Sequence, residues 1–465
     1  MLNVNDKIEL DIKRIGINGE GIGYYNRLAV FVKNAIPGER CAVVITSVSE
    51  KMAFGKVVSY IKQSPDRVEP KCKYYGVCGG CNTMHINYNK MCDLKRQTIV
   101  EALERYTDLN PRSFEIKKTI GCENPYNYRY KTSLPVRKFN DMATIGLYSV
   151  DGKEVVYIDS CMNQADKINN INKKILAFMD EINVVPYTEK FRRGEVKYIV
   201  TRLSHFNKEA QVTFIVNEKT PKIMELAKKV ITIEGVVSVY ESISDGEGDS
   251  LIFGSNIKLL EGKQTIIENI GKYKFELKPT AFFQLNPVQT EVLYQEVLKA
   301  CKLSFKERVL DAYCGVGTIG IYLSHNAKEV VGIEYNKEAV ENAVNNALLN
   351  KVKNAKFLQG DVVELLPHMI DSGEAFDVIV CDPPRVGLGA DLCEAILKSN
   401  AKRMVYVSCN PATLAKDLNI LTRTYNVKYI QPVDMFPNTS HVESIVLLEK
   451  KIVFCLAVNN IGVTN

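Results

Sequence analysis

The segment VLDAYCGVGTIG, residues 309–320, decides the fold of the C-terminal part of the chain. An apolar run ending in Asp311 leads into a glycine-rich turn and then a helix-forming pattern. Gly315, Gly317 and Gly320 have the G-x-G-x-x-G spacing of dinucleotide-binding folds, in which glycines let the backbone approach a ligand closely. Alone this pattern is weak, and at this point a nicotinamide cofactor has to be considered first.

Strand-like and helix-like patterns alternate regularly from about Glu307 onward. This alternation predicts an α/β, Rossmann-like fold with a doubly wound, mostly parallel sheet that helices cover on both faces. Two more strand-like runs, Val427–Val433 and Val442–Leu448, would complete the edge of the sheet. The predicted strands are Arg308–Asp311, Glu329–Ile333, Lys356–Leu358, Asp377–Val380 and Met404–Ser408, and the predicted helices are Gly317–Leu323, Lys337–Leu349, Val362–Met369, Ala390–Lys398 and Ala412–Leu421.

An acidic residue follows each of the first three strands of this sheet. Asp311 ends the first strand, where a carboxylate can hold a cationic ligand and would repel a pyrophosphate. Glu334 ends the second, where it can accept hydrogen bonds from both ribose hydroxyls, and Asp361 after the third can contact an adenine amino group. Three acids in register resemble the class I methyltransferase pattern, which implies S-adenosylmethionine. From the strand ends we add Gly315 and Asp361 to its site.

The last strands of the sheet suggest the chemistry. Asp382 follows the fourth strand in a turn that two prolines make rigid. Cys409 follows the fifth strand near a helix N-terminus, a location that lowers the pKa of a thiol. A thiolate that attacks carbon 6 of uracil turns the ring into an enolate whose carbon 5 can take a methyl group. Glu443, at the start of the final strand, is a candidate base for the carbon 5 proton.

The N-terminal residues 1–62 read as short strands separated by glycine and proline turns. Several strands in so few residues predict a small closed β-barrel, the architecture of many oligonucleotide-binding (OB-like) modules. A purely scaffolding barrel is nearly as compatible with the pattern. The predicted strands are Ile8–Ile15, Leu28–Lys33, Arg40–Val48 and Gly55–Ile61.

Residues 63–277 mix strands and helices without a repeat from which a topology can be derived. The pattern predicts a helix from Asn87 to about Tyr106, and two more over Lys167–Ile182 and Pro221–Ile231. Leu134–Tyr148 and Tyr198–Val216 are predicted strands.

Three of the thirteen cysteines, Cys72, Cys78 and Cys81, lie within ten residues of one another. Four thiolates hold either zinc or an iron–sulfur cluster. The spacing is not that of a zinc ribbon, which has two pairs of cysteines. Cys92, Cys122 or Cys161 could supply the fourth ligand.

Four motifs taken together resemble those of the RNA uracil-5-methyltransferase family, and the resemblance covers nearly the whole chain. It implies an RNA-binding TRAM domain in residues 1–62 and a class I methyltransferase domain in residues 278–465. It also implies that Cys409 is the nucleophile and Glu443 the general base. The cofactor-site residues it implies are Gln284, Tyr313, Glu334 and Asp382, with Asp382 also near the target base. The motifs are Phe282-Phe283-Gln284-Leu285-Asn286, Asp382-Pro383-Pro384-Arg385, Ser408-Cys409-Asn410-Pro411 and His441-Val442-Glu443.

The same resemblance chooses Cys161 as the fourth cluster ligand and implies a [4Fe-4S] cluster in a central α+β domain, residues 63–277. Within the family, the cluster belongs to the branch that modifies 23S ribosomal RNA, whereas the transfer RNA enzyme lacks it. We therefore expect methylation of carbon 5 of a 23S uridine. One departure is Met84, where the family usually has Gln before the histidine.

Composition limits the alternatives. No apolar run reaches the roughly 18 residues of a membrane span, and the N-terminus lacks a signal-peptide layout, so we expect a cytoplasmic protein. The net charge of +6 permits a polyanionic partner without demanding one. No obligate protein partner is evident, and we expect a monomer. Two alternatives stay open. One is the same chemistry on transfer RNA. The other is an iron–sulfur nicotinamide oxidoreductase, a function that leaves Asp311 unexplained and gives Cys409 and Glu443 no role.

Overall fold

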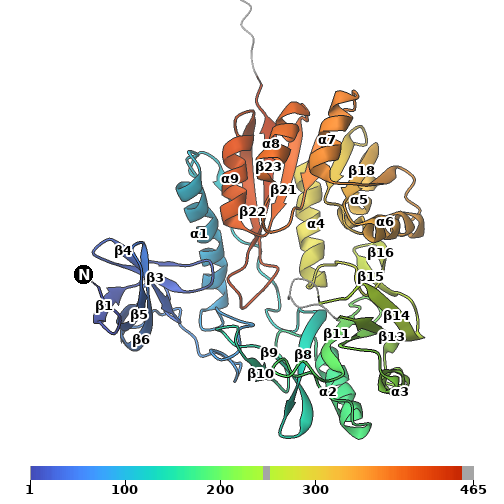
Figure 1. Ribbon diagram of the computed structural model, residues 1–465. Helices are drawn as coiled ribbons and strands as arrows, with labels where there is room; N and C mark the ends of the chain where they lie inside the picture. The colour runs from blue at the N-terminus through green and yellow to red at the C-terminus, as the bar shows by residue number, and fades with distance from the viewer. Residues whose placement is uncertain (1, 245–251, 453–465) are drawn as a thin grey trace, which may run out of the picture.

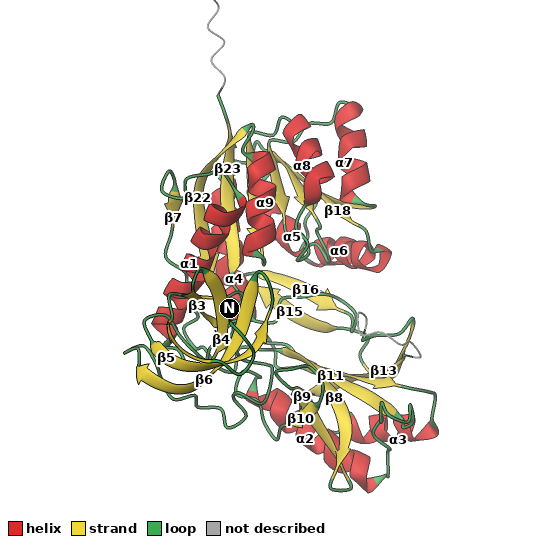
Figure 2. Cartoon of the chain, turned by 60° about the vertical axis from the view of Figure 1, so that its left-hand side comes forward, coloured by secondary structure: helices red, strands yellow, loops and turns green. Residues whose placement is uncertain are grey.

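The structure is a computed structural model that describes residues 2–244 and 252–452. It has an N-terminal barrel, a central domain and a C-terminal α/β domain, each with its own large β-sheet, and a separate two-stranded hairpin (Figures 1 and 2). Val453–Leu456, the apolar part of the C-terminal tail, lies outside the described residues. Within the described ranges, no helix combines the length and the apolar character needed to cross a membrane.

The N-terminal barrel is one six-stranded sheet with the order β1-β5-β6-β4-β3-β2. A Cβ at Gly23 would lie 2.6 Å from Asp11 O, so glycine lets β3 pass close enough to β1 to close the barrel. The predicted strand Ile8–Ile15 is divided, because Ile12 N donates to Glu39 O and Lys13 N to Ile22 O. The strands are β1 (Lys7–Asp11), β2 (Arg14–Ile15), β3 (Gly21–Tyr25), β4 (Leu28–Lys33), β5 (Arg40–Val48) and β6 (Met52–Lys62).

The central domain has a seven-stranded sheet in the order β10-β9-β8-β11-β12-β13-β14, with helices α2 (Asp166–Glu181) and α3 (Pro221–Val230) on one face. Two sequence predictions are wrong here, because each predicted long strand is a hairpin of two strands. Asn140 and Asp141 both have positive φ (49° and 62°), as a two-residue hairpin turn requires. The strands are β8 (Lys131–Phe139), β9 (Met142–Tyr148), β10 (Val155–Tyr157), β11 (Val196–Leu203), β12 (Ala210–Val216), β13 (Val236–Ile243) and β14 (Asn256–Gly262).

The C-terminal domain is the predicted doubly wound α/β domain. Its eight-stranded sheet has the order β19-β18-β17-β20-β21-β23-β22-β7, and β23 is the strand that runs antiparallel to its neighbours. Alternate residues of each strand enter different cores: Leu310 packs in one apolar cluster and Val309 in the other. The strands are β17 (Arg308–Ala312), β18 (Glu329–Glu334), β19 (Ala355–Gln359), β20 (Val378–Cys381), β21 (Arg403–Ser408), β22 (Tyr425–Val433) and β23 (Glu443–Lys450).

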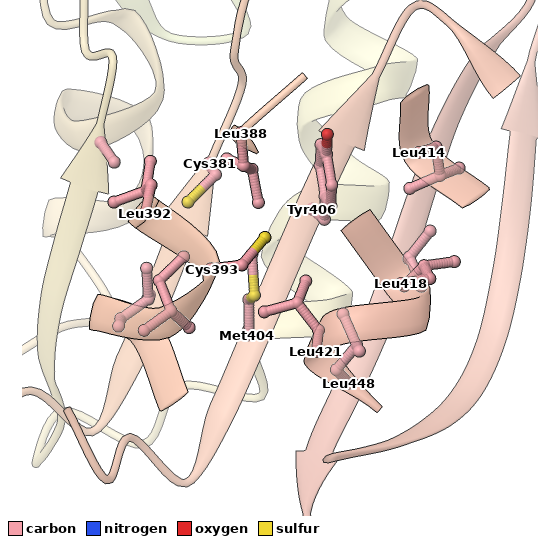
Figure 3. Close-up of a cluster of buried hydrophobic side chains, with 14 of the residues drawn as sticks. Cys381, Leu388, Leu392, Cys393, Met404, Tyr406, Leu414, Leu418, Leu421 and Leu448 are labelled. Atoms are coloured by element: carbon pink, nitrogen blue, oxygen red, sulfur yellow. The ribbon is translucent and has the colours of Figure 1, made fainter. Parts of the chain in front are cut away.

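Helices cover both faces of this sheet. Figure 3 shows one face, where Leu392 of α8 and Leu414 and Leu418 of α9 meet Met404 and Tyr406 of β21. This packing fixes β20, β21 and β23 beside one another. The helices are α4 (Pro287–Cys301), α5 (Thr318–Ser324), α6 (Lys337–Leu349), α7 (Val362–Asp371), α8 (Gly389–Lys398) and α9 (Pro411–Leu421).

Segments that precede residue 278 also pack on the C-terminal domain. Helix α1 (Tyr88–Tyr106), predicted as a helix from the sequence, lies against α9 (Figure 1). Strand β7 (Glu115–Ile116) pairs with β22, and the hairpin β15 (Ile266–Ile270)–β16 (Tyr273–Leu277) shares an apolar core with α4. Neither of these last two contacts was predicted from the sequence.

Candidate active site

The glycine turn after β17 leaves room for a ligand at one position only. A Cβ at Gly317 would lie 3.0 Å from the Cβ of Ala343 and from the ring of Phe357, and one at Gly320 would lie 3.0 Å from Asp311 Oδ2. Gly317 and Gly320 therefore serve close packing. Gly315 has a φ of 54°, and a Cβ there would meet nothing within 4 Å. The open space at the turn is in front of Gly315.

The three strand-end acids differ in their partners. Glu334 accepts hydrogen bonds from Gly315 N (3.1 Å) and Asn336 N (2.8 Å), so it is fixed beside the glycine turn. Asp361 caps α7 by accepting from Val363 N at 2.9 Å. Asp311 is fully buried, and its Oδ2 accepts from Gly320 N at 2.7 Å. Its role in the described structure is to hold the start of α5 on the strand.

The other residues predicted for the cofactor site are distributed around the same sheet edge. Tyr313 follows β17 with a φ of 64° and is half-buried. Gln284 precedes α4, and of the two phenylalanines before it Phe282 is 71% exposed while Phe283 is buried. Asp382 follows β20, and burial raises its pKa to about 7.

The residues predicted to be catalytic lie opposite each other. Strands β21 and β23 pair antiparallel with Ser408 opposite Ser444. The same register, continued by one residue, sets Cys409 opposite Glu443. Asp382, on the neighbouring strand end, raises the pKa of both side chains through its charge. The sheet therefore brings Cys409, Glu443 and Asp382 together at one edge.

The electrostatics of Cys409 differ from the sequence prediction. Asn410 caps α9, so the predicted helix N-terminus is present beside the thiol. Nevertheless burial, followed by the charges of Glu443 and Asp382, raises the pKa of Cys409 to about 11, while Arg385 lowers it. The prediction of a lowered pKa is wrong for the protein alone, because it omitted the burial of the thiol and, after it, the carboxylates that the fold gathers around it.

Glu443 is a buried carboxyl group with a strongly shifted pKa. Burial and the charge of Asp382 raise it to about 8, and Arg385 and Lys95 oppose this shift. A carboxyl group whose pKa lies near neutrality can accept and return protons at physiological pH.

The loop that leads into Glu443, residues 434–442, is anchored by α1. Lys95 Nζ donates to Asp434 Oδ1 at 2.6 Å and to Phe436 O at 3.1 Å. Tyr88 Oη donates to Asp434 Oδ2 at 2.8 Å. The side chains of Lys95 and Asp434 are both 0% exposed, so this is a fully buried ion pair. Sequence reasoning missed it because the partners are 339 positions apart.

The same loop is also held by the cysteine-rich segment. Ser440 N donates to Asn82 Oδ1 at 2.9 Å, directly beside Cys81, and Ser440 Oγ donates to Ile17 O of the barrel at 2.6 Å. Asn438 Nδ2 donates to Asn163 Oδ1 at 3.1 Å, and Asn163 Nδ2 donates to Cys81 Sγ at 3.1 Å. A short chain of hydrogen bonds thus joins the cysteines to the loop before Glu443.

Four of the cysteines line a single hollow: Cys72, Cys78, Cys81 and Cys161. Cys92 and Cys122 are not among its lining residues. Burial and the neighbouring thiols raise the pKa of Cys81 to about 12. Across residues 2–244 and 252–452, no three His, Cys, Asp or Glu side chains converge closely enough to hold a single metal ion.

Comparisons with known proteins agree with this architecture. The family model "tRNA (Uracil-5-)-methyltransferase" matches residues 87–451, and the TRAM domain model matches residues 2–58. The chain is 41% identical over 452 residues to an uncharacterized RNA methyltransferase of Bacillus cereus, and the aligned residues make up 97% of this chain and 98% of that protein. It is 40% identical over 449 residues to an uncharacterized RNA methyltransferase of Clostridium acetobutylicum, covering 96% and 97% of the two chains.

Among solved structures, the chain is similar to the tRNA (uracil-54, C5)-methyltransferase of Pyrococcus abyssi in complex with S-adenosyl-L-homocysteine. The TM-score is 0.75 at 25% identity, with 95% of this chain and 100% of that chain covered. The matched residues 87–451 include the glycine turn, Cys409 and Glu443. The chain therefore belongs to the tRNA (uracil-5-)-methyltransferase family and is an S-adenosylmethionine-dependent RNA methyltransferase that carries a TRAM domain at its N-terminus.

Proposed function

We propose that this enzyme methylates carbon 5 of a uridine in 23S ribosomal RNA through a covalent bond between Cys409 and the base. The observation that carries the proposal is the pairing of β21 with β23, which ends at Ser408 opposite Ser444 and leaves Cys409 and Glu443 close enough to interact electrostatically at one sheet edge. A nucleophile and a base on adjacent strand ends can act on neighbouring atoms of one ring. The nicotinamide oxidoreductase alternative is wrong, because the family is one of methyltransferases.

The steps assign one bond change to each residue. The Cys409 thiolate bonds to carbon 6 of uracil, and the ring electrons move to form an enolate. When bound, S-adenosylmethionine would supply the methyl group for carbon 5, with the bond between the methyl carbon and the sulfonium sulfur breaking and S-adenosylhomocysteine as the leaving group. Glu443, as a carboxylate, then removes the proton from carbon 5. The electrons left behind re-form the 5,6 double bond, the carbon–sulfur bond breaks, and Cys409 is a thiolate again.

The cofactor site consists, in this proposal, of Gln284, Tyr313, Gly315, Glu334, Asp361 and Asp382. The free space in front of Gly315 supports it, and so does the hydrogen bond that fixes Glu334 there. The carboxylate of Asp361 also caps α7. Asp382 is also proposed to lie beside the target base, which has to leave its stack to reach Cys409.

We also propose that Cys72, Cys78, Cys81 and Cys161 hold a [4Fe-4S] cluster. These four thiols share one hollow, and thiolates are the ligands of such clusters. In a cluster each thiolate binds its own iron atom, so the four sulfur atoms need not converge on one point. This is compatible with the finding that no three metal-binding side chains of the described residues could hold a single ion.

Ribosomal RNA is proposed as the substrate because the cysteine set accompanies that branch of the family. The alternative is transfer RNA, which is the substrate named for the similar Pyrococcus abyssi enzyme. To separate the two, purified enzyme is incubated with cofactor and with transcripts of 23S ribosomal RNA or of transfer RNA that contain 5-fluorouridine. Fluorine at carbon 5 cannot be removed as a proton, so the covalent complex persists and migrates slowly in a denaturing gel.

We expect a trapped complex with the 23S transcript and none with transfer RNA. The Cys409→Ala variant should give no complex, while Cys92→Ala, which removes a half-buried thiol outside both proposed sites, should match the unmodified enzyme. Trapping on transfer RNA alone would overturn the ribosomal assignment, and trapping by Cys409→Ala would overturn the covalent mechanism.

A further inference from the structure

Two cationic side chains lie next to each other where the central domain meets the catalytic domain. Lys131 is the first residue of β8, and it is the register partner of Arg202 on β11. Arg202 is only 5% exposed. Its Nη2 donates to Ala281 O. Its Nε and Nη1 are buried and have no hydrogen-bond partner among the described residues.

The acid nearest to this pair is already occupied. Glu268 lines the same hollow, but its carboxylate accepts hydrogen bonds from His205 N (2.6 Å), Phe206 N (3.0 Å) and Asn269 N (3.0 Å). In the described part of the chain, neither Lys131 nor Arg202 forms an ion pair. The contact found for Lys131 Nζ is with the ring of Phe253, 5.5 Å from its centroid.

Such an arrangement is costly unless a negative charge completes it, because a buried cation without a counter-ion loses its hydration. The titration of both groups reflects this cost. Burial, and then the charge of Arg202, lower the pKa of Lys131 to about 7. Burial lowers the pKa of Arg202 to about 10. Both cations would gain from the arrival of an anion.

The hollow that these cations line is continuous with a segment of the proposed active site. Its walls include Phe283 and Gln284, and the Ala281 carbonyl that Arg202 holds lies three positions before Gln284. The accessible space inside it is about 10 Å³, roughly what one water molecule needs. The hollow therefore admits one oxygen atom of a charged group and not a whole nucleotide.

We infer that Lys131 and Arg202 form an anion subsite that takes one charged oxygen group of the reaction's substrates, either an RNA phosphodiester or the carboxylate of the methionine part of S-adenosylmethionine. Arginine suits this role because its guanidinium stays charged and carries several N–H donors. Nε and Nη1 are left without partners, so both are available to donate to an oxygen of the incoming group. The inference rests on the proposed function for the identity of the substrates.

The test measures binding by the full-length protein and by the variants Arg202→Met and Lys131→Met. The RNA probe is a fluorescein-labelled oligouridylate of about ten residues, titrated over a series of salt concentrations. The cofactor probes are S-adenosylhomocysteine and 5′-methylthioadenosine, which lacks the carboxylate. Lys138→Met, which removes an exposed cation of the same strand, is the matched control.

If the group is a phosphodiester, each variant should reduce the slope of log Kd against log salt by about 0.7, with cofactor binding unchanged. If it is the carboxylate, the Kd for S-adenosylhomocysteine should rise about tenfold or more, as for a lost charged hydrogen bond. The Kd for 5′-methylthioadenosine and the salt slope should then stay the same. Arg202→Lys should keep part of the binding in either case.

The inference is overturned if both Met variants bind RNA and S-adenosylhomocysteine like the Lys138→Met control. A variant that fails to fold is identified by circular dichroism, and the other Met variant and Arg202→Lys then provide the comparison. Failure of the proposed function has a different signature, since the unmodified enzyme would then trap no 5-fluorouridine RNA, whatever the salt slopes of the variants.

Discussion

Replacing Glu443 with Gln should separate the two halves of the proposed reaction. Gln has the same shape but cannot accept the proton from carbon 5. We therefore expect Glu443→Gln to form the bond between Cys409 and uracil and then to release it slowly. The magnitude follows from what a positioned general base contributes, about 10²- to 10⁴-fold in rate.

The unmodified enzyme supplies a second magnitude, taken from the environment of Glu443. Burial and Asp382 raise its pKa to about 8. Only about one-tenth of the carboxyl groups are then ionised at pH 7, and nearly all at pH 9. Since only the ionised form accepts a proton, release of the methylated RNA should accelerate about tenfold between these two values.

The assay is a single-turnover experiment with RNA containing ordinary uridine, quenched at successive times and resolved on a denaturing gel. The decay of the covalent complex reports the proton-removal step. In that complex the sulfur of Cys409 is already bonded to carbon, so the thiol pKa of about 11 does not affect the decay. This separates the titration of Glu443 from that of Cys409.

The outcome that would refute the reasoning is a Glu443→Gln variant whose complex decays within a few-fold of the unmodified enzyme. A decay rate that does not change between pH 7 and pH 9 would instead contradict the raised pKa of Glu443. Glu449→Gln, a half-buried residue near the other end of the same strand, is the control and should behave like the unmodified enzyme.

Three further predictions concern other parts of the molecule. Lys95→Met should lower the free energy of unfolding by about 3–5 kcal/mol, because it leaves Asp434 buried without a counter-charge. Urea denaturation measures this loss, and the double variant Lys95→Met/Asp434→Leu should recover part of it. A Lys95→Met variant as stable as the unmodified enzyme would contradict the buried ion pair. Anaerobically purified enzyme should contain about four iron atoms per chain by colorimetric analysis. The Cys161→Ser variant should lose most of this iron, whereas Cys122→Ser should keep it. Equal iron content in the two variants would rule out Cys161 as a ligand. Glu334→Ala should weaken binding of S-adenosylhomocysteine by about tenfold or more in a calorimetric titration, because the carboxylate held by Gly315 N is removed. Unchanged affinity would mean that the ligand binds away from Glu334.

The sequence was sufficient for the parts of the fold that depend on local patterns. The strands and helices after Glu307 follow the predicted alternation, since each buried strand is a continuous apolar run. The hairpins at Asn140 and Phe206 were missed because the apolar runs on both sides of each turn were taken as one strand, although polar residues stand at both turns. The membership of β7 in the catalytic sheet could not be predicted, because two residues carry no periodicity.

The active site was predictable to the extent that its residues stand at strand ends. Strand order brings Asp382, Cys409 and Glu443 to one edge, so their positions in the sequence were informative. Their pKa values were not, because these depend on burial and on charges from distant segments such as Lys95. The unpaired guanidinium of Arg202 was equally invisible, since nothing local distinguishes it from an ordinary strand residue.

The anchoring of residues 434–442 has a consequence for how the enzyme matures. Cys409 is presented by the sheet and its own helix cap, whereas the approach to Glu443 is held by groups from the barrel, from the cysteine-rich segment and from α1. A partly assembled molecule would therefore possess its nucleophile before its base was in register. Such a species could capture an RNA but not let it go, so completing the N-terminal segments that hold this loop protects RNA substrates as much as it helps to recognise them.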